Sequence, residues 1–300
     1  MDFSLEHAQK NVLLAPYTTY KIGGPAEYFV TATSKEELVG WILMARKLKL
    51  PYFIMGSGAN ILIRDGGIAG LVILNRYNTI TVEGTTLKAG SGATIADAIA
   101  LAGSSGLSGL EHYAGIPSTV GGALWQNLHF LSPDRERTIY IAEVLERAEI
   151  LTNDGQVHTV NTGFFQFGYD ESILRDEPDI IALSATFSLT PERTEIIQER
   201  ITANLEWRKA RQPQVEEYPS CGSVFKKIEG VGAGRLIEQA GMKGYRLGGV
   251  QVSSLHANFL INVDGATASD VLALISLIQK TVEEKTGYHL QPEIHVVGRD

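Results

Sequence analysis

The sequence predicts an α+β protein of about two domains, and three observations support this prediction. The chain has 300 residues, whereas one domain typically takes roughly 100–200. Short apolar runs alternate with glycine-rich turns over the first two thirds, and some of them pair as hairpins, which a purely parallel sheet does not contain. Longer stretches with helical periodicity occur in the last third.

The first helix is expected over 34–50. Ser34 stands at its N-cap position and Glu37 follows three residues later, which is the spacing of a capping box. Apolar runs around this helix and beyond it predict strands, hairpins and one short helix. The strands cover 26–32, 51–55 and 71–74, the hairpins cover 79–90 (turning at Glu83-Gly84) and 148–160 (turning at Asn153-Asp154-Gly155), and the short helix covers 94–107.

A long amphipathic helix over about 191–210 leads into the C-terminal part and ends near Gln212-Pro213, where we expect the domain boundary. A second long helix over 267–287 begins with Thr267 as its cap and carries Asp270 at its third position. The remaining elements are shorter. They are a helix around 234–240 and strands over 249–253, 257–263 and 293–298.

The composition excludes several classes of protein. With 44% hydrophobic and 20% charged residues, the chain is typical of a globular protein. No segment approaches the ~18 apolar residues that cross a bilayer, and the start is acidic where a signal peptide is basic, so we expect a cytoplasmic protein without membrane insertion. One cysteine excludes an intrachain disulfide and a multi-cysteine metal site. A net charge of −8 argues against nucleic acid as a partner.

A glycine-rich loop, Gly-Ser-Gly-Ala-Asn over 56–60, follows one predicted strand. Its backbone N–H groups could converge on an anion. It is not the dinucleotide fingerprint, because Asn60 replaces the third glycine and no helix is expected next, and it lacks the Gly-Lys-Ser/Thr of a P-loop. The loop is therefore either a phosphate cradle without a helix or a structural double turn.

A second glycine-rich connection over 109–127 contains Ala-Gly-Ile-Pro at 114–117 and Val-Gly-Gly at 120–122. Small residues let a flat ring or a pyrophosphate approach the backbone closely, and Pro117 stiffens the approach. Two such loops, about 60 residues apart, favour a large phosphate-bearing cofactor between them.

The stretch Tyr-Pro-Ser-Cys-Gly-Ser-Val-Phe-Lys-Lys over 218–227 offers two candidate nucleophiles, Cys221 and Ser223. A local excess of positive charge follows, which is either an anion site or a solvated basic face. Its cations are Lys226, Lys227, Arg235, Lys243 and Arg246, and its anions are Glu229 and Glu238.

Seven segments, in order, resemble the UDP-N-acetylenolpyruvoylglucosamine reductases of peptidoglycan synthesis, in their shorter branch. The resemblance runs from about residue 16 to 298, and the ordered set is far more specific than any one motif. The segments are TTYKIGGPAEYFV, GSGANILIRDGGIAGLVI, GLEHYAGIPSTVGGA, PSCGSVFK, AGRLIEQAGMKGYRLGGVQVS, HANFLINVDGATASDV and LQPEIHVVG.

The resemblance implies an FAD-binding domain of the vanillyl-alcohol-oxidase (PCMH) type over 1–190, built from two subdomains. A smaller α+β substrate-binding domain is then expected over 191–300, a range that counts the long helix before Gln212-Pro213 with this domain. The resemblance also implies non-covalent FAD, NADPH as hydride donor, and UDP-N-acetylglucosamine enolpyruvate as the substrate that becomes UDP-N-acetylmuramate. A monomer or weak dimer is expected.

The resemblance assigns the catalytic roles as well. Its Gly-Ser-x-Phe-Lys motif falls on Ser223, which would give a proton to C2 after hydride reaches C3. Glu293 matches a second acidic catalyst, which would work best protonated, and burial raises a carboxyl pKa in that direction. Tyr169 and Lys226 would bind substrate. Cys221 is then expected to be a small packed residue.

The same resemblance implies a set of residues that contact FAD, mostly from the two glycine-rich loops. They are Tyr20, Gly56, Ser57, Gly58, Ala59, Asn60, Ile61, Ala114, Gly115, Ile116, Pro117, Ser118, Val120, Gly121, Gly122, Asn127 and Arg235.

The sequence departs from the family pattern at important places. The family usually carries Tyr-Arg-x-Ser, whose arginine stabilises the enolate, but Asp170 stands in the arginine's place. An anion there would oppose the developing charge. Arg175 is a candidate substitute, although a solvent-facing role is equally open. Ser118 stands where glycine is common, and the segment 125–130 replaces a Met-Asn-Ala-Gly run, keeping only Asn127.

Two alternatives follow from these departures. One is a paralogue that binds flavin or a nucleotide sugar but has lost catalysis, and the other is a different FAD oxidoreductase on the same scaffold, such as an alcohol oxidase. Retention of Ser223 and Glu293 argues against the first. The second has no evident need for a Gly-Ser-Val-Phe-Lys loop and usually has a much larger substrate domain. A metal site is not expected, although His289, Glu293 and His295 alternate, because Pro292 intervenes and further ligands are lacking.

Overall fold

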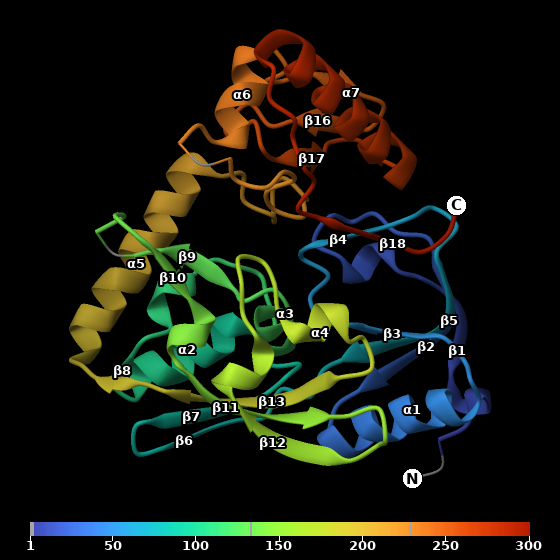
Figure 1. Ribbon diagram of the computed structural model, residues 1–300, viewed down its shortest axis with the longest axis vertical. Helices are drawn as coiled ribbons and strands as arrows, with labels where there is room; N and C mark the ends of the chain where they lie inside the picture. Colours follow the sequence, from blue (N-terminus) through green and yellow to red (C-terminus); the bar gives the residue numbers. More distant parts are fainter. Residues whose placement is uncertain (1–2, 133, 229) are drawn as a thin grey trace.

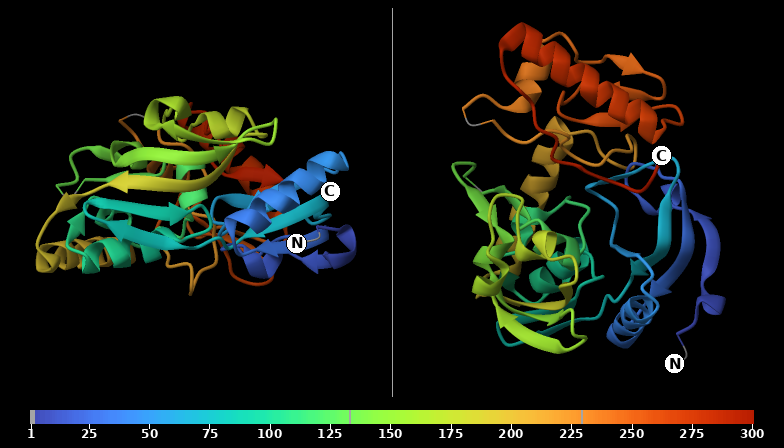
Figure 2. Two further views of the ribbon diagram at one scale, coloured as in Figure 1. Left: turned by 90° about the horizontal axis from the view of Figure 1, so that it is seen from below. Right: turned by 45° about the vertical axis from the view of Figure 1, so that its right-hand side comes forward.

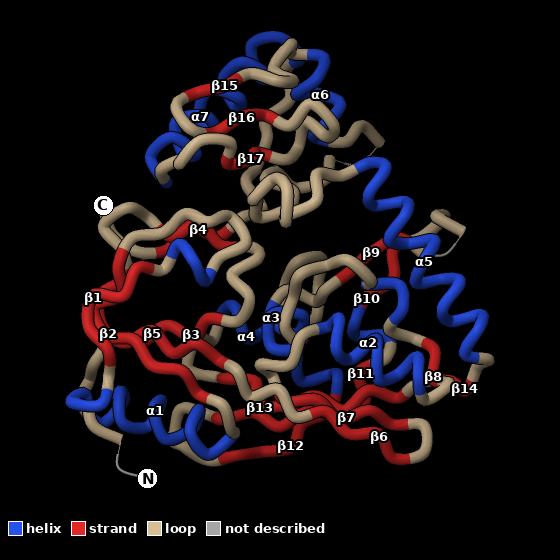
Figure 3. The backbone as a smooth tube through the Cα atoms, turned by 180° about the vertical axis from the view of Figure 1, so that it is seen from behind, coloured by secondary structure: helices blue, strands red, loops and turns tan. Residues whose placement is uncertain are grey.

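The computed structural model describes residues 3–132, 134–228 and 230–300. Within these ranges the secondary structure forms three units, and two of them share the N-terminal two thirds of the chain (Figure 1). A four-stranded sheet and a five-stranded sheet lie side by side, and a unit with two helices and a small sheet stands above both (Figure 3). The predicted α+β class is confirmed.

The first unit contains strands β1 (Gln9–Leu13), β2 (Pro25–Ala32), β3 (Tyr52–Met55) and β5 (Ile68–Asn75), and helix α1 (Lys35–Lys47). The strand order is β1-β2-β5-β3; β1 is antiparallel to β2, and the other pairs are parallel. Helix α1 covers the outer face, where Leu38 and Ile42 share a buried cluster with Leu71 and Ile73. The predicted N-cap is confirmed, because Ser34 Oγ accepts from the Glu37 N–H at 3.1 Å.

The second unit contains strands β6 (Ile80–Glu83), β7 (Thr86–Gly90), β11 (Leu145–Leu151), β12 (Val157–Asn161) and β13 (Ile181–Ser188), and helices α2 (Ile95–Ser104) and α3 (Val120–Trp125). The sheet is antiparallel throughout, in the order β12-β11-β13-β7-β6. Both predicted hairpins are present. Each turns through a glycine with positive φ, Gly84 at +58° and Gly155 at +81°, a conformation that other residues adopt only under strain.

Shorter elements complete this unit. They are β8 (Leu107–Ser108), paired with β14 (Thr190–Pro191), the hairpin β9 (His129–Leu131) and β10 (Thr138–Tyr140), and helix α4 (Ile173–Asp176). The β9–β10 hairpin was not predicted from the sequence. Helix α5 (Thr194–Arg211) then runs along the side of the second unit and leads to the C-terminal unit (Figure 1). It begins later than predicted and buries only Ile197 and Asn204.

The C-terminal unit contains α6 (Ala233–Gln239), β15 (Arg246–Leu247), β16 (Val250–Val252), β17 (Leu260–Asn262) and α7 (Ala268–Thr286). The predicted start of α7 is confirmed, because the side chains of Thr267 and Asp270 each bond the other's backbone N–H. Gly287 ends the helix with a φ of +76°. Neither α7 nor any other helix in the described ranges has the length and apolarity to cross a membrane.

The last strand leaves the C-terminal unit. Strand β18 (His295–Val297) is present as predicted, but it pairs in parallel with β4 (Ile61–Ile63), which directly follows the first glycine-rich loop. The final segment therefore returns to the first unit and lies beside strands that are about 230 residues earlier in the sequence (Figure 2). The pairing carries residues 293–297 down to the glycine-rich loop.

Asp65 fixes the C-terminal unit to the first unit. Its carboxylate accepts from the N–H groups of Ala268 at 2.8 Å and Ser269 at 3.0 Å, in the first turn of α7. Partial burial alone would raise the pKa of Asp65, but the bonds from Ser269 and Ala268 outweigh it and lower that pKa. The carboxylate thus stabilises the positive end of the helix dipole.

Replacing Asp65 with alanine is expected to lower the free energy of unfolding by about 1 kcal/mol at pH 7, the usual loss for a helix N-terminal acceptor. Because the folded pKa is depressed, this contribution exists above the unfolded pKa and is lost as pH falls through the folded value. Urea titrations of both proteins at pH 7 and pH 3 measure it. An equal difference at the two pH values would contradict the assignment.

Candidate active site

A cavity of about 1,320 Å³ lies where the three units meet. It is larger than the roughly 300–1,000 Å³ of an ordinary small-molecule pocket. The glycine-rich loop after β3, the connection before α3, the loop over 220–227 and the segment before β18 all reach its wall. The volume is suited to a dinucleotide together with a second ligand.

The loop over 56–60 keeps its backbone donors free. The N–H groups of residues 57–60 bond no other described residue, and Gly58 has a φ of +64°. Ser57 Oγ donates to the carbonyl of Pro117 at 2.6 Å, which joins the two predicted loops. Four consecutive free N–H groups favour the anion cradle over the structural double turn. As expected, a strand and not a helix follows.

The connection over 114–122 behaves differently. Its N–H groups at Ile116, Val120 and Gly121 donate to carbonyls within the protein, so these donors are not available to an anion. A Cβ at Gly121 would lie 3.1 Å from the side chain of Ser91. This glycine therefore serves helix packing as well as the cavity wall.

Most of the predicted cofactor contacts reach the cavity. Those on its wall are Gly56, Ser57, Gly58, Ala59, Asn60, Ile61, Gly115, Ile116, Pro117, Ser118, Gly121, Gly122 and Arg235. Four others do not: Tyr20, Ala114, Val120 and Asn127. Tyr20 is fully buried in the core of the C-terminal unit, and Asn127 donates behind the wall to the carbonyl of Gly168 at 2.9 Å.

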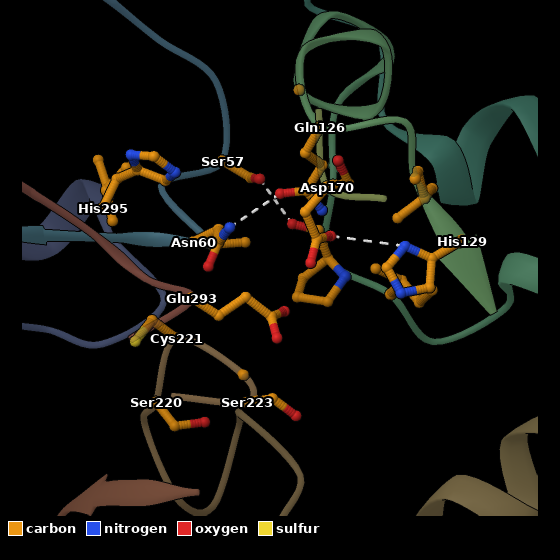
Figure 4. A pocket seen from close by; sticks show the side chains of 18 of the residues that line it. Ser57, Asn60, Gln126, His129, Asp170, Ser220, Cys221, Ser223, Glu293 and His295 are labelled. Carbon is orange, nitrogen blue, oxygen red and sulfur yellow. Dashed lines mark hydrogen bonds and ion pairs between the residues drawn. The ribbon is translucent and has the colours of Figure 1, made fainter. Parts of the chain in front are cut away.

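Ser223 and Glu293 come from neighbouring backbone segments. The Glu293 N–H donates to the carbonyl of Val224 at 2.7 Å, and Asn258 bonds both main-chain groups of Phe225. These bonds fix the two segments side by side, and both side chains point into the cavity (Figure 4). The two predicted catalytic residues are therefore brought together.

Cys221 has the packed environment that was expected of it. It is only 2% exposed and belongs to the apolar core of the C-terminal unit. Burial raises the pKa of its thiol. A buried, protonated thiol is a poor nucleophile, so Ser223 is the chemically accessible residue of the pair.

Glu293 is a carboxyl group that stays protonated at neutral pH. Burial raises its pKa to about 8, and the charge of Asp170 acts in the same direction against that of Lys226. The side chain can therefore donate a hydrogen bond at pH 7. His295, two residues later at the start of β18, is neutral at pH 7, because burial and the nearby cations lower its pKa to about 4.

The two lysines of the loop over 220–227 differ in whether they reach the cavity wall. Lys226, the predicted substrate ligand, is half-buried and does not form the cavity wall, although its charge acts on Asp170 and Glu293. Lys227, which the sequence marks only as one cation of the basic patch, is on the wall. Residues alternate between opposite faces of an extended segment, and this alternation is a signal that could have separated them.

The predicted basic patch is dispersed. Lys243 pairs with Glu238 at 3.0 Å and Arg246 with Asp264 at 2.9 Å, while Glu229 is outside the described residues. A cation from outside this patch, Arg208 of α5, lies on the cavity wall and forms no ion pair with a described carboxylate. Burial lowers the pKa of Arg208 to about 10, so it remains charged and available to an anion.

Asp170 occupies the wall opposite Glu293. It is 5% exposed and has a φ of +55°. Its carboxylate lies 3.5 Å from Nδ1 of His129, on β9, and Arg175 donates to its main-chain carbonyl at 2.8 Å. The Cζ atom of Arg175 also lies over the ring of Trp125, 5.5 Å from the ring centroid. The sequence analysis did not find His129, since nothing local marks it as a partner of Asp170.

The side chain of Tyr169, the other predicted substrate ligand, lies on the wall beside His129, with ring centroids 4.7 Å apart. No group of three or more metal-ligating side chains occurs among the residues that the structure describes. His289 lies 3.6 Å from Glu283 instead.

Known proteins resemble the chain over nearly its whole length. Residues 212–297 match the model of the UDP-N-acetylenolpyruvoylglucosamine reductase C-terminal domain, and residues 26–161 match that of an FAD binding domain. The UDP-N-acetylenolpyruvoylglucosamine reductase of Lactiplantibacillus plantarum is 41% identical over 97% of this chain and 94% of its own. The UDP-N-acetylenolpyruvoylglucosamine reductase 2 of Bacillus thuringiensis is 40% identical over 98% of this chain and 94% of its own. The crystal structure of the Thermus caldophilus reductase superposes with a TM-score of 0.80 at 33% identity, over 97% of this chain and 99% of that one.

Proposed function

Since the chain belongs to the UDP-N-acetylenolpyruvoylglucosamine reductase family, we propose that it uses NADPH and non-covalent FAD to reduce UDP-N-acetylglucosamine enolpyruvate. The product would be UDP-N-acetylmuramate, a peptidoglycan precursor. The single observation that carries the proposal is the position of Ser223 and a neutral Glu293 on one cavity wall. We further propose a cytoplasmic monomer or weak dimer.

The residues present fit FAD. The free N–H groups of residues 57–60 would hold its pyrophosphate, and the small residues at 115–118 would face its ring system. Arg235 and Arg208 would supply positive charge to phosphates at the cavity wall. When bound, FAD carries the hydride between NADPH and the substrate.

The chain's own residues would manage charge and protons. Addition of hydride to C3 of the enolpyruvyl group leaves negative charge at C2 and on the carboxylate, and Ser223 Oγ would protonate C2. Neutral Glu293 would donate a hydrogen bond to that carboxylate. Lys227, on the wall, and Lys226, behind it, would contribute the positive field. Cys221 takes no part.

The test uses the purified protein. The proposal predicts flavin absorbance and NADPH consumption that requires the enolpyruvyl nucleotide. A yellow protein that binds the nucleotide without turnover would instead support the impaired paralogue, which Asp170 favours. Oxygen consumption driven by oxidation of an alcohol, with no turnover of the nucleotide, would support another FAD oxidoreductase.

Arg175→Ala is expected to lower kcat/KM for the nucleotide about tenfold, a typical loss when one nearby charge no longer stabilises the transition state. The guanidinium lies beside Asp170 on the wall that would face the enolate. Arg175→Lys, which keeps the charge, should recover part of the loss. A normal rate for Arg175→Ala, with unchanged thermal stability, would remove this residue from the mechanism.

A further inference from the structure

Two departures from the family pattern meet in space. Asp170 replaces an arginine, and His129 lies in the rebuilt segment 125–130, some 41 residues earlier. The structure places the Asp170 carboxylate 3.5 Å from Nδ1 of His129, on the cavity wall opposite Glu293 (Figure 4). Two changes that looked independent in the sequence therefore form one acid–imidazole pair.

The pair is buried and incompletely bonded. Asp170 is 5% exposed, and its Oδ2 and the Nδ1 of His129 have no hydrogen-bond partner among the described residues. Arg175 forms no ion pair with the carboxylate, because its guanidinium bonds the main-chain oxygen, although its charge lowers the pKa of Asp170 from a distance. An unpartnered buried carboxylate is costly. Both atoms are buried just behind the cavity wall that the two residues form, where a proton would complete their bonding.

The groups around the pair carry mixed charge. Tyr169 and Glu171 flank Asp170 in its own loop, Tyr140 reaches His129 from β10, and Arg175 approaches from α4. The loop over 220–227 contributes Lys226 and Lys227, and the segment before β18 contributes Glu293. Burial raises the pKa of Asp170 and lowers that of His129. Both directions favour a pair without net charge while the cavity holds no anion.

We propose that the Asp170–His129 pair binds the carboxylate of the enolpyruvyl nucleotide and takes up one proton from solvent as that carboxylate arrives. The inference rests on the proposed function. In the bound state Asp170 is a carboxylic acid and His129 an imidazolium, so the pair presents a charge of +1 at the cavity wall. That is the charge of the absent guanidinium. A nearby anion drives this uptake, because it raises the pKa of both groups.

Isothermal titration of the holoenzyme tests the proposal. UDP-N-acetylmuramate, which carries the carboxylate and does not turn over alone, is titrated at pH 6.5–7.5 in buffers of different ionisation enthalpy. We expect uptake of about one proton per nucleotide and about tenfold weaker binding per pH unit near the upper end. UDP-N-acetylglucosamine, which lacks the carboxylate, should bind without uptake. Repeating the titration in Glu293→Gln removes the other group that titrates nearby.

Variants of His129 and Asp170 test whether this pair takes up the proton. In His129→Gln and in Asp170→Asn, each checked for folding by thermal unfolding, the uptake should fall to near zero while UDP-N-acetylglucosamine binds as before. Asp170→Arg should bind the carboxylate-bearing nucleotide with an affinity that does not depend on pH. The inference would be overturned if UDP-N-acetylmuramate bound the unaltered protein with an affinity that does not depend on pH, or if both nucleotides caused equal proton uptake. Either result would leave the proposed function standing. Failure to bind either nucleotide would overturn both.

Discussion

Replacing Ser223 with alanine is expected to leave reduction by NADPH at its normal rate and to slow reduction of the enolpyruvyl nucleotide by about 10²–10⁴-fold. That range is the usual contribution of a positioned proton donor. Ser223 is held by the bonds of Asn258 to Phe225 and of Glu293 to Val224, so alanine removes the hydroxyl without disturbing the loop. Stopped-flow absorbance of the flavin measures each half-reaction separately.

Cys221→Ala is the matched control. Cys221 is two residues away and is packed in the core, so this variant should lose some stability while both half-reactions keep their rates. If Ser223→Ala slowed both half-reactions equally, Ser223 would have a structural role. If Cys221→Ala abolished the second half-reaction alone, the thiol would be the proton donor and our assignment would be wrong.

Replacing Glu293 with alanine is expected to slow the same half-reaction about 10²–10³-fold, the usual cost of removing one donor from a site of developing charge. Glu293→Gln keeps a neutral donor and should stay within about tenfold of the unaltered enzyme. The raised pKa of about 8 predicts that the unaltered rate falls as pH rises through that value, because an ionised Glu293 repels the anionic substrate. In Glu293→Gln this fall should disappear.

Protein stability gives an independent measurement of the same group. The folded state holds the Glu293 proton more tightly than the unfolded state, so the contribution of this group favours folding at low pH and is lost between about pH 4.5 and 8. In thermal unfolding, the stability of Glu293→Gln relative to that of the unaltered protein should therefore increase as pH rises through this range. Parallel pH profiles for the two proteins would mean that Glu293 ionises normally.

Local signals in the sequence were sufficient for much of the fold. Ser34 and Thr267 start helices where the cap pattern placed them, and both hairpins turn at the predicted glycines. These features depend on a few adjacent residues, whose backbone preferences act over one turn. Strand partners could not be predicted in the same way, because the pairing of β18 with β4 depends on the packing of all three units.

The site shows the same division. The glycine-rich loop and Ser223 are contiguous motifs, and the structure brings both to one cavity. Tyr20 belonged to a matching motif, yet it is fully buried in a core. His129 had no motif at all, and only its distance to Asp170 gives it a role. Whether a side chain faces a cavity or a core is decided by distant segments, which a local pattern does not contain.

The return of the last strand affects how the protein is made. Until residues 295–297 leave the ribosome, strand β4 has an open edge and the loop at 56–60 lacks its neighbour. Nascent chains of nearly full length therefore expose an unpaired strand to their surroundings, the kind of edge on which chains associate wrongly. The cofactor binding that we propose for this loop would then be a late event of biosynthesis, after translation of the segment that carries Glu293.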